Sequence, residues 1–396
     1  MDRTASKMTS IVALMAVFSL AICFIIVGAI SEELKKSLAI TNAEIGQLVL
    51  ALFLTSAIVE VIIGPLVDKF GYKPVGIVGF LVASGSMFLI AQAPSFQAAF
   101  FACVLLGVGA MCLNTVGNTL IPVVLFGGKD PARASNFGNA FFGLGLVVTP
   151  LIFSVVDYKT GVFVLGALLL AFLLAALATR FPQVSTGYQF SMAIKLLGNR
   201  SVLVAALALF CYISLESSMN TWSKPYMTEL FGGADQPGAV AKAGFVLSLF
   251  GVAMMAGRFL TSMIKNLTAI GVRLIAGASV VAMASILLMI VTKHSGFATA
   301  AVITTGLVFA PIFPTIVGVT FAKFEPRLYG SIFGIIFAVG LLGGTFVPQF
   351  IGKLSVGASV QQSLLIVFAM AAALFVISMF LKTGAPAGEK KTVART

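Results

Sequence analysis

The sequence contains little charge: only 10% of its 396 residues are Asp, Glu, Lys or Arg, whereas 59% are hydrophobic. A soluble domain of this composition could not cover itself with polar surface, so we exclude a soluble protein and expect lipid as the solvent. Histidine occurs once, at His294, and neither a His-Glu-x-x-His motif nor a phosphate-binding glycine loop with Lys-Ser/Thr is present. These absences argue against an enzyme and against ATP-driven transport, and no cofactor is expected.

Cysteine is scarce as well. The four cysteines all fall inside apolar segments, and no pair has the spacing of metal ligands. We interpret them as small buried hydrophobic residues and expect no metal site. They are Cys23, Cys103, Cys112 and Cys211.

Long apolar runs are abundant. A hydrocarbon core about 30 Å thick requires roughly 20 apolar residues per spanning helix, and runs of that length recur along the chain between short polar segments. We therefore predict an all-α membrane protein with twelve transmembrane helices. Their expected ranges are 9–30, 44–66, 74–92, 97–122, 135–156, 160–180, 201–227, 239–262, 270–292, 297–322, 329–350 and 360–381.

The net charge of +12 follows this topology. With a cytoplasmic N-terminus, only seven of the 25 basic residues fall outside the cell or within a helix: Lys35, Lys36, Lys159, Lys224, Lys242, Lys293 and Lys353. The inner side is thus enriched in basic residues, as the positive-inside rule requires. We expect both termini to be cytoplasmic and the protein to lie in a bacterial cytoplasmic (inner) membrane, without a nucleic-acid partner.

A repeat relates the two halves of the chain. Residues 129–138 and 323–334 share a lysine, an acidic residue, a proline and an arginine, followed by Ser-x-Phe-Gly. The copies lie about half a chain apart, which predicts two parallel six-helix bundles that rock to give alternating access. We predict an N-terminal bundle at 1–180, a cytoplasmic linker at 181–200, a C-terminal bundle at 201–383 and a cytoplasmic tail at 384–396. Within the tenth helix, Pro311 and Pro314 should produce a kink and free backbone carbonyls.

The segment Gly64-Pro-Leu-Val-Asp68-Lys-Phe-Gly71-Tyr-Lys73 resembles the signature loop of the major facilitator superfamily. The resemblance implies an inner gate at Asp68, Gly71 and Lys73. Glycine permits a tight turn, and Asp68 could face either a helix N-terminus or a basic side chain.

A narrower resemblance is to the fucose:proton symporter family and its glucose-transporting relatives. It is carried by Leu113-Asn114-Thr115-Val-Gly-Asn118, Gly257-Arg258-Phe259, Phe313-Pro314-Thr315 and Tyr212-Ile-Ser-Leu-Glu216. It implies sugar uptake driven by a cation gradient. Family members carry acids in helices 1 and 4, at the positions of Gly28 and Asn114, whereas Asn118 matches a family asparagine.

The seventh predicted helix is the richest in polar residues. Glu216, Asn220 and Lys224 follow Tyr212 at four-residue steps and share one helix face, beside a second stripe with Trp222 and Tyr226. An aromatic face beside amide and carboxylate groups suits a sugar. Alternatively, Glu216 and Lys224 neutralise each other, and the two aromatic residues belong to an interfacial belt.

Other polar residues in the predicted helices are also candidates, since ionisable groups at membrane depth are costly. Asn114, Asn118 and Asn139 supply carboxamides that suit hydroxyl groups, or they bond between helices. Glu60 could carry a proton or pair at the gate with a base such as Arg258.

These observations favour a monomeric secondary active transporter for a small polar solute, with a sugar as the first candidate. Glu216 is the first candidate for coupling to a proton or sodium ion, and Glu60 the second. The alternatives are an uncoupled facilitator, a carrier of organic anions, an exporter of amphipathic compounds and a transport-dead nutrient sensor.

Overall fold

The computed structural model describes residues 3–40, 42–182, 190–233, 235–355 and 359–381. The predicted tail at 384–396 and part of the predicted linker, residues 183–189, lie outside them. Within this part of the chain, twelve helical segments are long and apolar enough to cross a membrane. The expected number of spans is therefore confirmed, by length and composition, and the protein is a multi-pass membrane protein.

The helices begin and end close to the expected residues. Those of the first half are α1 (Arg3–Ala29), α3 (Asn42–Phe70), α4 (Tyr72–Ala91), α5 (Phe96–Val124), α6 (Pro131–Val155) and α7 (Tyr158–Ala178). Those of the second half are α9 (Arg200–Leu230), α10 (Ala239–Ser262), α11 (Leu267–Val291), α12 (Ser295–Phe309) with α13 (Ile312–Phe321), α14 (Tyr329–Ser355), and α15 (Val360–Ser363) with α16 (Leu365–Ser378). The sequence reading did not anticipate the short helices α2 (Ser31–Leu38) and α8 (Phe190–Leu196), nor the turns η1 (Leu125–Gly128) and η2 (Pro326–Leu328).

Several helix starts are explained by local capping. Ser95 accepts a hydrogen bond from the Ala98 amide at the start of α5, and Asn199 accepts one from the Ser201 amide at the start of α9. Asp157 does the same for the Thr160 amide of α7, and hydrogen bonds from the Thr160 hydroxyl and amide hold the pKa of the exposed Asp157 carboxyl below its usual value. Each side chain satisfies a backbone donor that the helix leaves unpaired.

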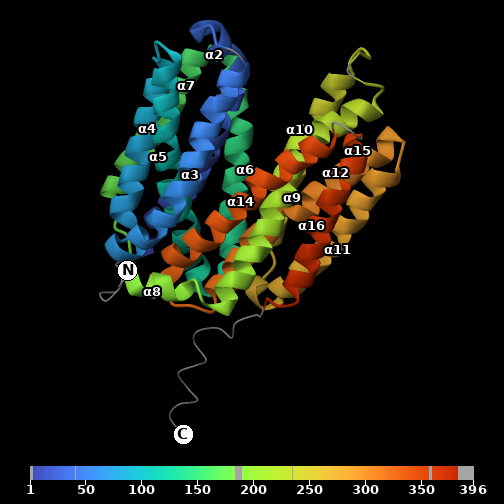
Figure 1. Cartoon of the computed structure of the whole chain (residues 1–396). Helices are drawn as coiled ribbons and strands as arrows, with labels where there is room; N and C mark the ends of the chain where they lie inside the picture. The colour runs from blue at the N-terminus through green and yellow to red at the C-terminus, as the bar shows by residue number, and fades with distance from the viewer. Residues whose placement is uncertain (1–2, 41, 183–189, 234, 356–358, 382–396) are drawn as a thin grey trace. The chain divides into compact units, whose positions relative to one another are not determined.

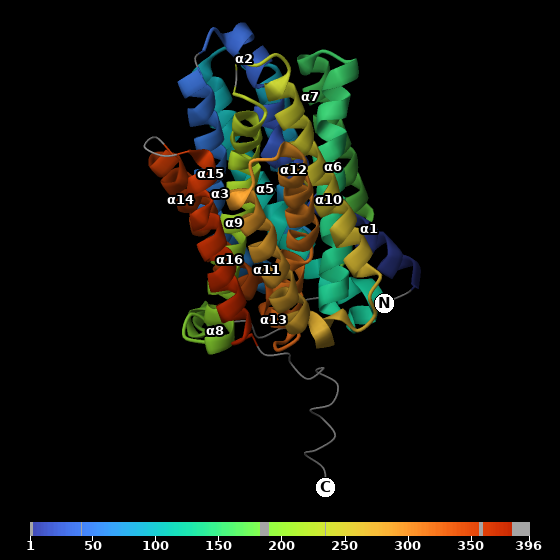
Figure 2. The same cartoon turned by 90° about the vertical axis from the view of Figure 1, so that its right-hand side faces the viewer.

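The chain divides into two compact units. Unit 1 contains Met1–Gly128, Phe141–Leu196 and Pro326–Ile335. Within it, α4 packs against α5 and α7, and both α1 and α3 pack against α5 (Figure 1). Unit 2 contains Lys129–Ala140, Leu197–Glu325 and Ile336–Thr396. Within it, α11 packs beside α12, α13 and α16 (Figure 2), while α9 packs against α10 and α16.

The repeated segments are exchanged between these units. Lys129–Ala140, which contains the first copy, belongs to unit 2, and Pro326–Ile335, which contains most of the second, belongs to unit 1. Glycine makes both close contacts possible because it has no Cβ. A Cβ on Gly330 would meet the Gly64 carbonyl of α3, and one on Gly318 of α13 would meet the Ala132 backbone of α6. The repeat therefore marks where each half of the chain joins the unit built mainly from the other half.

Apolar side chains cover the outer faces of the helices. On α3, for example, Ile58, Val61 and Ile62 are each more than half exposed. Such a surface is unfavourable in water and fits a protein whose solvent is lipid.

Candidate functional site

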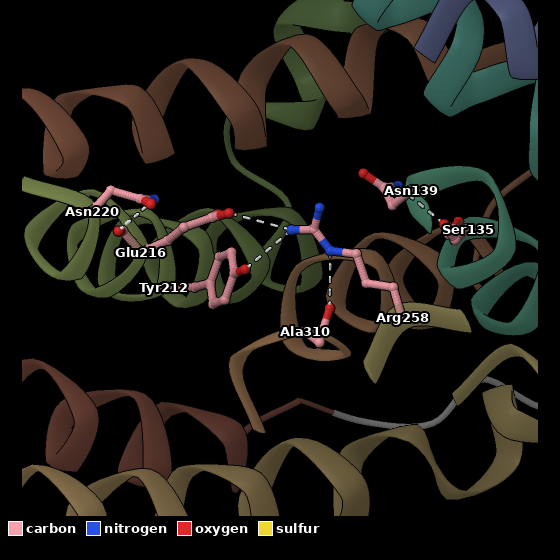
Figure 3. A network of polar contacts seen from close by, with 7 residues as sticks. All are labelled: Ser135, Asn139, Tyr212, Glu216, Asn220, Arg258 and Ala310. Carbon is pink, nitrogen blue, oxygen red and sulfur yellow. Dashed lines mark hydrogen bonds and ion pairs between the residues drawn. The ribbon is translucent and has the colours of Figure 1, made fainter. Parts of the chain in front are cut away.

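Arg258 of α10 is the centre of a polar cluster in unit 2 (Figure 3). Its guanidinium donates from Nη2 to Glu216 Oε1 at 3.3 Å and to the Tyr212 hydroxyl at 3.4 Å, both on α9. Its Nε donates to the Ala310 carbonyl at 3.3 Å. Arg258 therefore links α9 and α10 to the break between α12 and α13.

The Ala310 carbonyl is available because of proline. In a continuous helix it would accept from the residue four positions later, which is Pro314, and proline has no backbone N–H. Pro311 lies at the break itself, between Ala310 and the start of α13. The expected kink is thus present, and Arg258 uses the carbonyl freed by it.

The ion pair in this cluster is only partly buried. The Arg258 side chain is 5% exposed and that of Glu216 is 23% exposed. Behind them, the buried Tyr212 ring stacks on Phe313 with ring centroids 6.2 Å apart. The cluster thus presents a compensated pair of charges whose carboxylate is accessible.

Two predicted asparagines accompany this pair in Figure 3. Asn220 is exposed one turn beyond Glu216 and donates to its carbonyl at 2.9 Å. Asn139 of α6 is buried and donates to the Ser135 carbonyl at 3.0 Å. Unit 2 therefore brings four of the predicted residues together: Asn139, Glu216, Asn220 and Arg258.

The two predicted aromatic contacts of α9 lie apart from this cluster. Trp222 donates from Nε1 to the Pro348 carbonyl at 3.0 Å, and its ring packs beside Gly352 of α14. Tyr226 is fully buried and donates to the Met289 carbonyl of α11 at 2.8 Å. Both side chains fasten α9 to neighbouring helices. Lys224, the alternative partner of Glu216, is exposed.

A second polar cluster lies in unit 1, on α3 and α5. Asn114 Nδ2 lies 3.4 Å from Glu60 Oε2, the Thr115 hydroxyl lies 3.1 Å from Glu60 Oε1, and Asn118 Nδ2 donates to Asn114 Oδ1 at 2.9 Å. All four side chains are buried. The structure thus joins three predicted residues and adds Thr115, whose only signal in the sequence was its place beside Asn114.

The predicted gate residues lie at one end of unit 1. Asp68 accepts hydrogen bonds from the Gly330 amide at 2.8 Å and the Ser331 amide at 2.6 Å, at the start of α14. Of the two expected partners, the structure has the helix N-terminus. Gly71 adopts a φ of 90°, which favours glycine, and Lys73 donates to the Leu177 and Thr179 carbonyls.

Unit 2 holds an analogous contact that the sequence reading did not identify. Asp130 accepts hydrogen bonds from the Leu267 amide at 2.8 Å and the Thr268 amide at 3.0 Å, at the start of α11. The Thr268 hydroxyl donates to Asp130 at 2.7 Å and accepts from the Ala132 amide at 3.0 Å. The only hint in the sequence was the position of Asp130 within the repeat.

Similarity to known proteins covers most of the chain. Residues 12–348 match the Major Facilitator Superfamily. The quinolone resistance protein NorA of Staphylococcus aureus (strain MRSA252) is 27% identical over 183 residues, which are 43% of this chain and 46% of NorA. The chain thus matches less than half the length of that curated relative.

Solved structures share the fold at low identity. A single-residue variant of the E. coli fucose:proton symporter FucP superposes with a TM-score of 0.76 at 19% identity, over 94% of this chain and 99% of that one. FucP in the outward conformation gives 0.77 at 18% identity over the same shares. The human organic anion transporter MFSD10 (TETRAN) gives 0.74 at 14% identity, over 95% and 99%. On the family match and this shared fold, the chain belongs to the Major Facilitator Superfamily, a family of transporters and not of enzymes.

Proposed function

We propose that the protein is a secondary active transporter that takes up a small, neutral, polar solute, with a sugar as the favoured class, together with a cation. The Arg258–Glu216 pair carries this proposal. Its two charges compensate each other, so the cluster offers hydrogen-bond donors and acceptors without a net charge to attract an ion. Asn139 and Asn220 would add carboxamide groups for hydroxyls.

An organic anion is the second candidate, because Arg258 could exchange Glu216 for a carboxylate of the solute. That exchange would leave Glu216 without its cation, which is costly even for a partly buried ion pair. Among the similar proteins, NorA is a quinolone resistance protein, FucP a fucose:proton symporter and MFSD10 an organic anion transporter. The similar proteins therefore differ in what they transport, and sugar uptake, organic-anion transport and drug export are all candidate functions for this protein.

We further propose that Asn114 and Asn118 contribute to solute binding from unit 1, and that Asp68, Gly71 and Lys73 form the inner gate. Both termini are placed in the cytoplasm. In support, the Thr9 hydroxyl donates to the Arg180 carbonyl and Lys73 bonds to the end of α7, so the basic residues Lys73 and Arg180 lie at the same end of unit 1 as the start of α1.

The test is uptake into proteoliposomes that contain the purified protein. A panel of labelled neutral sugars and small carboxylates is presented with and without an imposed proton or sodium gradient. Gradient-stimulated accumulation of one sugar, with no competition by carboxylates, is the expected result. Uptake of carboxylates alone would replace this proposal with the organic-anion carrier, and sugar uptake without gradient stimulation would indicate a facilitator.

A further inference from the structure

The Thr115 hydroxyl has two acceptors and one hydrogen. Its Oγ1 lies 3.0 Å from the Met111 carbonyl, one turn earlier on α5, and 3.1 Å from Glu60 Oε1. A hydroxyl carries a single donor, so it cannot direct its hydrogen to both oxygens. Thr119, Thr149 and Thr305 donate to the carbonyl four residues earlier. If Thr115 does the same, the short contact to Glu60 requires a hydrogen on the carboxyl itself.

No cation compensates a negative charge at Glu60 within the part of the chain that the structure describes. Its side chain is fully buried, and its hydrogen-bond partners are the Asn114 amide and the Thr115 hydroxyl. Burying a carboxylate without a cation is far more costly than burying the neutral acid. Glu216 differs, because Arg258 lies 3.3 Å away. Glu60 is thus the carboxyl of the two clusters that lacks a compensating cation.

The helices that pack against α3 bring few titratable groups near Glu60. On α5 the titratable group is the buried Cys112 thiol, two residues before Asn114, and from α14 the contact is made by Gly334. Other titratable residues lie on α3 and on the elements that pack against it. They are Asp68 at the end of α3, Tyr72 and Tyr329 beside it, Arg327 of η2, Cys23 of α1 and Glu33 of α2. Protonation of Glu60 is thus set mainly by its burial and its two polar neighbours.

We propose that Glu60 is the proton-binding site of this transporter, with Thr115 as the group that changes partner when the proton leaves. In the protonated state, the Glu60 carboxyl donates its hydrogen to Thr115 Oγ1, and Thr115 donates to the Met111 carbonyl. Release of the proton leaves a carboxylate, and the Thr115 hydroxyl turns from Met111 to donate to it. The second carboxylate oxygen accepts from Asn114, which itself accepts from Asn118.

This inference rests on the proposed function and gives it a coupling step. The acid lies against Asn114, one of the two asparagines assigned to the solute. Charge on Glu60 strengthens its hydrogen bond from Asn114 and so fixes that carboxamide, whereas the neutral acid holds it less tightly. Protonation of Glu60 would then loosen the Asn114 carboxamide for the solute, so that proton and solute bind cooperatively.

Infrared difference spectroscopy of the full chain in lipid vesicles tests the proton site without a known solute. Because all 13 Asp and Glu residues contribute carboxylic-acid C=O absorption as the pH is lowered, the band of interest is the component found in the unmodified protein and missing from Glu60→Gln. Glu216→Gln is the matched control and should retain the band. Thr115→Val should shift its frequency, whereas Thr119→Val, one turn further on α5, should leave it unchanged.

Absence of such a component, with the unmodified protein and Glu60→Gln absorbing alike, would overturn the proposal. If Glu60→Gln does not fold, the frequency shift in Thr115→Val decides, and an unshifted band there would also overturn it. In proteoliposomes, Glu60→Gln should lose proton-driven accumulation and retain solute exchange. A band without any sugar uptake would leave the proton site in place and reject the proposed solute class instead.

Discussion

At the residue scale, the polar cluster of unit 2 depends on the buried positive charge of Arg258, which needs the carboxylate of Glu216 beside it. Arg258 is 4% exposed, and its guanidinium has acceptors on α9 and at the proline break. Removing Glu216 would leave the guanidinium buried without its anion, which is costlier than removing both partners together.

We therefore expect Glu216→Gln to lower the free energy of unfolding by about 1–3 kcal/mol, toward the lower end because Glu216 is partly exposed. Arg258→Met combined with Glu216→Gln should recover part of that loss. Thermal unfolding of the purified variants measures both effects as a double-mutant cycle. Lys224→Gln, exposed on the same helix, is the control and should change stability by less than about 0.5 kcal/mol. A cycle with no coupling energy would contradict the pairing.

The sequence predicted the positions of the polar residues of α9 better than the roles of its aromatic residues. Glu216 and Asn220 were found because helical spacing alone places them on one face. Trp222 and Tyr226 share the same regularity, yet they bond to carbonyls of α14 and α11. Periodicity identifies a helix face but cannot reveal which neighbour covers it, and that neighbour decides whether an aromatic ring binds solute or fastens helices.

At the element scale, α11 begins without a cap of its own. Asn266, which precedes it, has a φ of 56° and makes no side-chain hydrogen bond to the helix. Asp130 provides that function from the start of α6, through the amides of Leu267 and Thr268. Sequence reading could not find this because the donor and acceptor are 137 residues apart.

Asp130→Ala should therefore expose the start of α11, at a cost of about 1–3 kcal/mol. Hydrogen exchange should accelerate at the Leu267 and Thr268 amides, as followed by mass spectrometry of peptides from this region. Asp157→Ala, which removes only the local cap of α7, is the matched control and should leave those amides unchanged. Unaltered exchange in Asp130→Ala would show that the contact does not hold the helix end.

The approach of α6 to α13 supplies a steric prediction. A Cβ on Gly318 would meet the Ala132 backbone, which cannot turn aside as a flexible side chain could. Gly318→Ala should lower the unfolding temperature of the purified protein and its transport rate. Gly277→Ala, on α11 with open space around it, should keep or raise that temperature because alanine favours helix. Equal effects of the two substitutions would rule out the close approach.

At the scale of the whole molecule, lipid made the architecture predictable. A fixed hydrocarbon thickness converts apolar run length directly into span number, so twelve helices could be predicted without tertiary information. The exchange of Lys129–Ala140 and Pro326–Ile335 was beyond such reading, because the repeat shows similarity and not partnership.

The predicted orientation can be tested with cysteine labelling. The four natural cysteines are buried and should not react with a membrane-impermeant maleimide. We expect Lys159→Cys to be labelled in intact spheroplasts and Lys265→Cys only in inverted vesicles, since both lysines are exposed and lie at opposite ends of the predicted topology. The reverse pattern would place both termini outside the cell.

The exchanged segments also impose an order of events during synthesis. Asp68 is synthesised 262 residues before Gly330, whose amide it binds, whereas Asp130 is synthesised 137 residues before its partner Leu267. At about 5–20 residues per second, the first interval lasts roughly 10–50 s. Unit 2 can therefore close its contact with α11 while unit 1, although begun earlier, stays open at the end of α3. Unit 1 is begun first, yet its contact at the end of α3 can form only after most of unit 2 has been synthesised.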